Sequence, residues 1–178
     1  MKEIWDIINK MKKKSYLIFL FTIILLSCSD SNNSIMNQVD VKTPAVFNLP
    51  DLDGKYINAT DLKGSYVLVN FWATWCAPCI EEIPELNKLF RDNDNIQLVG
   101  IAIDDIDAVN KFISKTPINY ESLISNDIKG VEISKSLGND RGVLPFTVLI
   151  KPNAKIQRVF YGKLDMVVLN SYLKDVIK

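Results

Sequence analysis

Two cysteines separated by two residues, Cys76 and Cys79, have the type and spacing that point most directly to chemistry. They lie in the run Trp75-Cys76-Ala77-Pro78-Cys79, and a helix-periodic stretch follows them. Residues i and i+3 at the start of a helix have Cβ atoms about 5–6 Å apart, so a small adjustment closes a disulfide. Cys76 would lie at the helix N-terminus, where unpaired N–H groups stabilise a thiolate. The pair is therefore predicted to exchange disulfides, with Cys76 as nucleophile and Cys79 as resolving thiol.

Other interpretations of the cysteine pair are half of a metal site, a purely structural disulfide, or two inert buried thiols. The chain has three cysteines and no histidine, so it lacks the ligands of a tetrahedral zinc site. No metal and no other cofactor is expected. Asp104, Asp105 and Asp107 suggest a cation site, but capping of the helix that follows them is the favoured interpretation.

Composition limits the function further. The 178 residues are 48% apolar, which is typical of one globular domain. The 21 basic residues balance 21 acidic ones, so no net positive field favours nucleic acid, and nucleic-acid binding is not expected. The absence of histidine excludes Ser-His and Cys-His nucleophile pairs. Thiol chemistry is left as the predicted activity.

The N-terminal residues have the pattern of an export signal. Lys12 to Lys14 precede an apolar run from Tyr16 to Leu26, which is too short for a transmembrane helix of roughly 20 residues. Leu25-Leu26-Ser27-Cys28 resembles the lipobox of bacterial lipoproteins, which implies that Cys28 carries lipid. A cleaved signal in which Cys28 is incidental and an uncleaved anchor are the alternatives. Met11 opens a compact signal and is an alternative start of translation.

The chain is accordingly divided into three parts. Residues 1–27 are predicted to be a signal peptide. Residues 28–43, rich in Ser, Asn and Asp, are predicted to contain the lipidated cysteine and a flexible tether. Residues 44–178 form the folded domain.

Periodicity predicts an α/β domain, a central sheet with helices on both faces. A hairpin is expected around the Asp51-Leu52-Asp53-Gly54 turn. Further strands are expected at residues 66–72, 96–103, 146–150 and 156–161, and helices from the cysteines to Phe90 and at 108–113, 131–137 and 166–177.

The cysteine motif and its surroundings resemble the thioredoxin fold, and more closely its membrane-tethered TlpA and ResA-like branch. The residues that carry the resemblance are the run Val69 to Cys79 (VNFWATWCAPC), Glu82 and Pro84, Gly142-Val143-Leu144-Pro145, and Gly162. The resemblance covers residues 44–178. It implies a thioredoxin fold with a central mixed β-sheet, helices on both faces, an N-terminal hairpin, and an insertion after the active-site βαβ unit.

The resemblance also implies roles for particular residues. Pro145 would be cis and face the cysteines, holding Leu144 extended so that its backbone pairs with a substrate peptide. Glu82 would lie near the cysteine pair as an active-site acid, whereas Glu81 and Glu85 would be solvated. Trp75 would be a partly exposed flank of the active site, and Ala77 and Pro78 would belong with Leu144 and Pro145 to the same flank and substrate-binding surface. Trp72 is expected in the core, Asn70 occupies the position of a buried acid in cytoplasmic thioredoxins, and Phe146 replaces a common Thr.

The resulting hypothesis is a lipid-tethered, extracytoplasmic thiol:disulfide oxidoreductase of a bacterial membrane, on the periplasmic side in a Gram-negative cell. Its clients would be proteins that carry disulfides, and a membrane partner of DsbD or CcdA type would supply electrons. The Ala77-Pro78 loop brings no cation to Cys76, which favours a reductant, and cytochrome c maturation is one task. Alternatives are a disulfide oxidant or isomerase, a thiol peroxidase, which usually has Thr or Ser where Ala73 stands, or a non-catalytic binding module.

Overall fold

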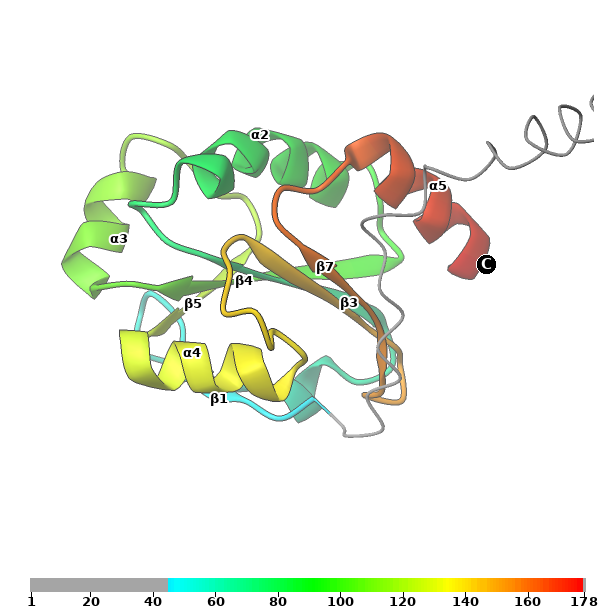
Figure 1. Cartoon of the computed structure of the whole chain (residues 1–178), viewed down its shortest axis with the longest axis horizontal. Helices are drawn as coiled ribbons and strands as arrows, with labels where there is room; N and C mark the ends of the chain where they lie inside the picture. Colours follow the sequence, from blue (N-terminus) through cyan, green and yellow to red (C-terminus); the bar gives the residue numbers. More distant parts are fainter. Residues whose placement is uncertain (1–44, 178) are drawn as a thin grey trace, which may run out of the picture. The chain divides into compact units, whose positions relative to one another are not determined.

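A computed structural model describes residues 45–177, and Figure 1 shows how their strands and helices are arranged. In chain order the elements are β1 (Asn48–Pro50), β2 (Tyr56–Asn58), the 3-10 helix η1 (Ala59–Leu62), β3 (Tyr66–Trp72), α2 (Ala77–Arg91), β4 (Ile96–Ile103), α3 (Ile106–Ile113), β5 (Glu121–Ser125), α4 (Asp127–Ser136), β6 (Phe146–Ile150), β7 (Ile156–Tyr161) and α5 (Met166–Val176).

The central sheet has five strands in the order β5-β4-β3-β6-β7. β4 pairs parallel with both β3 and β5, whereas β6 pairs antiparallel with both β3 and β7. β3 lies in the middle, where Asn70 is level with Gly100 of β4 and Thr147 of β6. The strands β1 and β2 form the separate N-terminal hairpin. The predicted mixed sheet with its preceding hairpin is confirmed.

The alternation of side chains along β3 divides the core between the two faces of the sheet. Val69 and Phe71 pack in one buried cluster with Phe47, which precedes the hairpin, and Leu137, which follows α4. Leu68 packs in a second cluster with residues of α2 and α5. Figure 1 shows α2 and α5 together over one face of the sheet and α4 over the other. Each fully buried Leu or Phe contributes about 1.5–3 kcal/mol, so both faces stabilise the central strand.

Helix α2 turns a mixed stripe of side chains toward the sheet. Its buried residues are Cys79, Glu82, Ile83, Leu86 and Leu89. Pro78 lies in the first turn, where a proline costs no hydrogen bond, and Pro84 lies inside the helix. Because one buried position of an otherwise apolar stripe is occupied by Glu82, the packing of α2 brings an ionisable group into the interior.

The insertion after the β3-α2-β4 unit consists of α3 and β5, and the sequence pattern does not predict β5. Glu121–Ser125 (ESLIS) adds a parallel edge strand beside β4, although Ser122 and Ser125 make its sequence half polar. Helix α4 begins at Asp127 rather than at the predicted Val131, because Asn126 caps it by accepting a hydrogen bond from the Lys129 backbone N–H.

The chain enters the described domain at Ala45, whose backbone N–H donates to the Ala154 carbonyl in the turn between β6 and β7. Within residues 45–177, no helix is long and apolar enough to cross a membrane. The predicted signal peptide, including Met11 and the apolar run from Tyr16 to Leu26, lies outside the described residues. Cys28 and the tether that follows it also lie outside them.

Candidate active site

Cys76 and Cys79 form a disulfide at the start of α2. Their Cα atoms are 5.3 Å apart, within the ordinary range for a disulfide. Cys76 is the N-cap residue, with extended backbone, and Cys79 lies in the first turn of the helix. The carbonyl of Cys76 accepts hydrogen bonds from the backbone N–H groups of Cys79 and Ile80. The motif therefore has the short-range helical geometry that its spacing predicts.

The two sulfur-bearing residues differ in access. Cys76 is 6% exposed and Cys79 is fully buried. Only Cys76 can be approached from solvent without movement of the helix, and it also lies at the positive end of the helix dipole. On either side of it, Trp75 is 67% exposed, and Ala77 and Pro78 are exposed. A protein partner would therefore meet Cys76 first.

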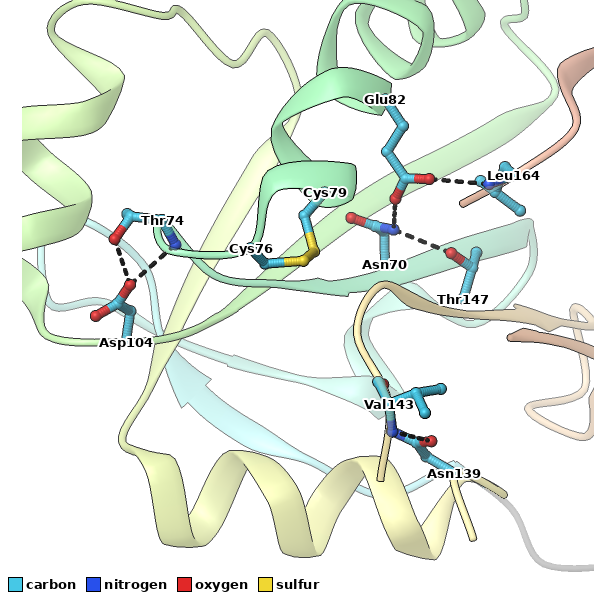
Figure 2. The surroundings of a disulfide bond; sticks show 10 residues. All are labelled: Asn70, Thr74, Cys76, Cys79, Glu82, Asp104, Asn139, Val143, Thr147 and Leu164. Atoms are coloured by element: carbon cyan, nitrogen blue, oxygen red, sulfur yellow. Dashed lines mark hydrogen bonds between the residues drawn. A yellow bond between two sulfur atoms is a disulfide. The ribbon is translucent and has the colours of Figure 1, made fainter. Parts of the chain in front are cut away.

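Behind the disulfide, the carboxyl group of Glu82 lies in the interior with two hydrogen-bond donors, and Figure 2 shows the network that they form. Glu82 is 1% exposed. Its Oε1 accepts from Asn70 Nδ2 at 2.7 Å, and its Oε2 accepts from the Leu164 backbone N–H at 3.0 Å. The same Nδ2 donates to Thr147 Oγ1 at 3.0 Å. β3, β6 and the loop before α5 thus contribute to one buried network around this acid.

Burial raises the pKa of Glu82 from its ordinary value of 4.5 to about 7. Desolvation of the carboxylate is the largest cause, and the hydrogen bonds from Leu164 and Asn70 and the positive charge of Lys163 oppose it. A pKa of about 7 allows the group to exist in both protonation states near neutral pH. Glu82 follows Cys79 by three residues on the same buried helix face, so both side chains lie on one side of α2.

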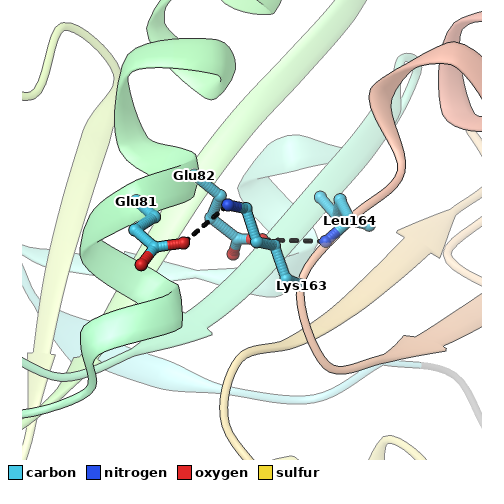
Figure 3. Close-up of polar contacts among 4 residues, drawn as sticks. All are labelled: Glu81, Glu82, Lys163 and Leu164. Carbon is cyan, nitrogen blue, oxygen red and sulfur yellow. Dashed lines mark hydrogen bonds and ion pairs between the residues drawn. The ribbon is translucent and has the colours of Figure 1, made fainter.

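The neighbouring Glu81 faces the surface. Figure 3 shows its exposed ion pair with Lys163, in which Nζ and Oε2 are 2.7 Å apart. The hydrogen bond to Glu81 raises the pKa of Lys163. An exposed pair of this kind adds little to stability, but it holds a positive charge next to Leu164, whose backbone N–H binds Glu82.

Leu144 and Pro145 lie where the chain enters β6, and the peptide bond between them is cis. Pro145 is buried, and Leu144 packs against the apolar cluster that contains both cysteines. Leu144 and Trp75 also line a mainly apolar cavity of about 270 Å³, together with Val131 and Ser134 of α4. This cavity joins the exposed flank of Cys76 to the face of α4.

A sequence model of the AhpC/TSA family matches residues 39–159, more than half of the chain. A ResA thiol-disulfide oxidoreductase of Bacillus thuringiensis subsp. konkukian is 30% identical over 175 residues, which cover 92% of this chain and 98% of that protein. The chain belongs to the AhpC/TSA family and is a ResA-like thiol-disulfide oxidoreductase.

Solved structures agree with this assignment. A thiol-disulfide oxidoreductase from Bacteroides fragilis is 28% identical with a TM-score of 0.63, and the match covers 75% of this chain and 99% of that one. A thioredoxin-related protein from Neisseria meningitidis serogroup B is 31% identical with a TM-score of 0.64, covering 71% of this chain and 96% of that one. The expected thioredoxin fold of this ResA-like oxidoreductase is therefore confirmed.

The structure of this ResA-like oxidoreductase corrects the interpretation of two of the three acidic residues expected to cap α3. Asp107 lies inside the first turn, where its backbone N–H donates to Asp105. Asp104 does not cap α3, because Asp105 is the N-cap and accepts from the backbone of Asp107 and Ala108. Instead, Asp104 Oδ2 accepts from the Thr74 backbone N–H at 2.9 Å and from its hydroxyl at 2.5 Å (Figure 2). Asp104 thus holds the segment that leads to Cys76. The described residues include no cluster of three acidic or cysteine side chains able to bind a metal.

Asn139 orders the loop that leads to Leu144 in this ResA-like oxidoreductase. Its side-chain Nδ2 donates to the Val143 carbonyl at 2.9 Å, and its Oδ1 accepts from the Val143 backbone N–H at 3.1 Å (Figure 2). A buried Asn that closes a loop by two bonds to one residue has no signature in sequence spacing, because any polar side chain in a loop could do so.

Tyr120 is a second group of this ResA-like oxidoreductase that sequence reasoning did not identify. Its buried hydroxyl and the buried Trp72 Nε1 lack hydrogen-bond partners among the described residues. A Cβ placed on Gly100 would meet a Tyr120 ring carbon at 3.0 Å and Trp72 Nε1 at 3.2 Å, so both rings close over that glycine. Burial raises the pKa of Tyr120, and the negative charge of Glu82 raises it further.

Proposed function

We propose that this protein is an extracytoplasmic reductant of protein disulfides that works through Cys76 and Cys79. The observation that carries the proposal is the arrangement of the pair: a disulfide at a helix N-terminus, accessible at Cys76, with the buried acid Glu82 behind it. A purely structural disulfide would not explain an ionisable group in the apolar stripe directly behind the sulfurs.

The reaction starts from the reduced pair. The thiolate of Cys76 attacks a client disulfide and forms a mixed disulfide, while the client's first sulfur leaves as a thiolate. The Cys79 sulfur then attacks Cys76 Sγ, which re-forms the Cys76–Cys79 disulfide and releases the client's second thiolate. Two electrons pass from the cysteine pair to the client, whose two thiolates take up protons.

Glu82 supplies a proton acceptor at the buried step. Cys79 is fully buried, so its thiol needs a base inside the protein before it can attack. The ionised carboxylate of Glu82 takes that proton and later returns it to solvent or to a product thiolate. Its pKa near 7 makes both transfers accessible at neutral pH. The same carboxylate disfavours a second negative charge nearby, so it holds the pKa values of the thiols up.

The surroundings of Cys76 favour a reductant over an oxidant. A strongly oxidising pair needs extra stabilisation of the thiolate, because this stabilises the reduced form and raises the reduction potential. Here the loop between the cysteines is Ala77-Pro78, which brings no cation to Cys76, and the buried ionisable group on the same helix is the carboxyl of Glu82. We expect a reduction potential below about −200 mV, closer to thioredoxin than to DsbA.

A client would bind across the exposed flank of Cys76. The backbone of Leu144, next to the cis peptide bond, would pair with an extended client segment, and Trp75 would cover it from the other side. The apolar cavity between Trp75, Leu144 and α4 would receive a client side chain. Ala77 and Pro78, both exposed, would line the approach to the sulfur.

The cellular setting is also part of this proposal. Export with a lipid on Cys28 and a tether over residues 28–43 would place the domain outside the cytoplasm, where disulfides persist. A membrane protein of DsbD or CcdA type would then re-reduce the Cys76–Cys79 disulfide. Cytochrome c maturation is a task that needs such a reductant.

Mixed-disulfide trapping tests the proposed function. The full chain with Cys79→Ser should accumulate covalent adducts with client proteins in the source cell, because the resolving step is lost. Cys76→Ser should form none and should not reduce insulin disulfides. Equilibration with glutathione measures the potential, and a value near the roughly −120 mV of DsbA would make the protein an oxidant.

The role of Glu82 is tested by the rate of Cys76 alkylation across pH. Glu82→Gln should change this pH profile and slow disulfide exchange. The matched surface variants Glu81→Gln and Glu85→Gln should behave as wild type, since neither carboxyl is buried. If the alkylation profile of Glu82→Gln were the same as those of Glu81→Gln, Glu85→Gln and the wild type, Glu82 would be a structural residue only.

A further inference from the structure

In the buried network, Asn70 lies between the carboxyl group of Glu82 and the hydroxyl group of Thr147. Its Nδ2 donates to Glu82 Oε1 at 2.7 Å and to Thr147 Oγ1 at 3.0 Å (Figure 2). All three side chains are at most 1% exposed. The other end of the amide, Oδ1, is buried without a hydrogen-bond partner among the described residues. The amide thus presents two donors to two oxygens and leaves its carbonyl unused.

This arrangement suits only the ionised form of Glu82. Each of its two oxygens receives an N–H group, one from Asn70 and one from the Leu164 backbone. A carboxylate is an acceptor at both oxygens, so it is satisfied. A protonated carboxyl must donate its own hydrogen, and neither oxygen faces an acceptor in this arrangement. An unpaired buried O–H costs about 1–3 kcal/mol.

Rotation of the Asn70 amide by half a turn gives the neutral acid an acceptor, and it moves the NH2 group to the side where Oδ1 has no partner among the described residues. The rotation exchanges Nδ2 and Oδ1 and leaves the heavy-atom positions nearly unchanged, since the terminal torsion of Asn is broad and roughly two-fold. Oδ1 then accepts the proton of neutral Glu82. It also accepts from the hydroxyl of Thr147, which can donate as well as accept. The rotated form is disfavoured when Glu82 is ionised, because Oδ1 would face a carboxylate oxygen.

We propose that the side-chain amide of Asn70 turns over whenever Glu82 gains or loses its proton, with Thr147 as the second partner in both orientations. Asn70 is then a positioning residue that adapts the buried site to both forms of the acid. The inference rests on the proposed role of Glu82 as proton acceptor. In the exchange reaction, the proton leaves Cys79 Sγ for the Glu82 carboxylate, and the amide turns so that the new O–H has an acceptor. No electrons move in this step.

The remaining groups that face Glu82 do not replace the amide as partner of the neutral acid. Leu164 offers a backbone N–H, which is a donor. Lys163 carries a positive charge and is bound to Glu81 at the surface. The pKa of Tyr120 is shifted by the charge of Glu82, but its hydroxyl makes no hydrogen bond to it. Asn70 Oδ1 is therefore the acceptor that the network can provide.

The experiment is a pH titration of the full-length oxidised protein, with the Asn70 side-chain amide followed by proton–nitrogen NMR. The oxidised form isolates Glu82 from cysteine titration. Both Nδ2 hydrogens are bonded when Glu82 is ionised and neither is bonded to these partners when it is neutral. Both resonances should therefore move in one step, with its midpoint at the pKa of Glu82, about 7. Amide resonances that stay fixed while the Glu82 carboxyl titrates would overturn the proposal.

Glu82→Gln provides the decisive variant, because the introduced amide imitates the neutral acid. Its own NH2 group would donate to Asn70 Oδ1 while its carbonyl accepts from the Leu164 N–H. The Asn70 resonances should then sit at the acid-limit positions of the wild type at every pH. Glu85→Gln is the matched control and should leave the titration unchanged. Asn70 resonances at the alkaline-limit positions in Glu82→Gln would contradict the rotation.

Asn70→Leu keeps the size of the side chain and removes the amide. It takes away a charge-assisted bond from ionised Glu82 and only a neutral one from the acid, so the infrared titration profile of the Glu82 carboxyl in the oxidised protein should move to higher pH. A packing role would leave that profile in place. Failure of this proposal can be told apart from failure of the proposed function. Insulin reduction, which Cys76→Ser should lose, tests the reduced cysteine pair, whereas the amide titration is measured on the oxidised protein without substrate.

Discussion

The burial of Glu82 should make the stability of the oxidised protein depend on pH. Its pKa rises from 4.5 to about 7 on folding, so the folded state holds this proton more tightly than the unfolded chain. Between these two pH values the folded state therefore binds more protons, and stability falls as pH rises. The stabilising contribution of the neutral acid is complete below pH 4.5 and is lost once pH passes about 7.

The size of the effect follows from the same two values. Each pKa unit corresponds to about 1.4 kcal/mol, so ionising Glu82 in place costs about 3 kcal/mol of the free energy of unfolding. Glu82→Gln cannot ionise and avoids this cost. The free energy of unfolding of the variant, minus that of the wild type, should therefore increase by about 3 kcal/mol from acid to alkaline pH. Most of the change should fall between pH 4.5 and about 7.

Urea unfolding of the oxidised proteins, followed by tryptophan fluorescence, measures this difference. Trp72 is fully buried next to the network and should report the transition. Comparison of variant with wild type at each pH cancels the other titrating groups, and Glu85→Gln tests for a general charge effect because Glu85 is exposed. A difference that does not change with pH would refute the argument that Glu82 is buried with a raised pKa.

Three further predictions concern its surroundings. Gly100→Ala should lower the free energy of unfolding by about 1–3 kcal/mol in urea titrations, because the new Cβ would crowd Tyr120 and Trp72; unchanged stability would show that the rings can move. Asp104→Ala should cost about 1–3 kcal/mol by the same assay and slow insulin reduction, since Thr74 loses its acceptor; equal rates would exclude a positioning role. Lys163→Gln should raise the pKa of Glu82, so the midpoint of its carboxyl infrared titration should move up; a downward move would contradict this.

The parts of the site that are local in sequence could be predicted, and those made by tertiary contacts could not. The disulfide joins residues three apart, and the burial of Glu82 follows from its place on the same helix face. The other members of the buried network around Glu82 come from three other segments, β3, β6 and the loop before α5. Thr147 is 77 residues from Asn70, and Leu164 is 82 residues from Glu82, so only the pairing of β3 with β6 and the position of the last loop bring them together.

Two features that the sequence pattern predicts wrongly, the strand β5 and the cap of α3, have local physical causes. In β5, Ser122 and Ser125 interrupt the apolar pattern, yet both are buried because the strand is covered on both sides. Asp104 and Asp105 are equivalent as helix caps in sequence, and the backbone conformation at the end of β4 decides which one caps α3. The pattern that predicts helices and strands contains neither kind of information.

The entry of the chain at Ala45 constrains how the domain could be held by a partner. The backbone of Ala45 is bonded to the β6–β7 turn, at the end of the sheet where β3 begins. The cysteines follow the other end of β3, about 20 Å away along the seven residues of that strand. A partner that holds the domain at the Ala45 end of the sheet would therefore leave the cysteine pair free at the opposite end of β3, where a second protein could reach it at the same time.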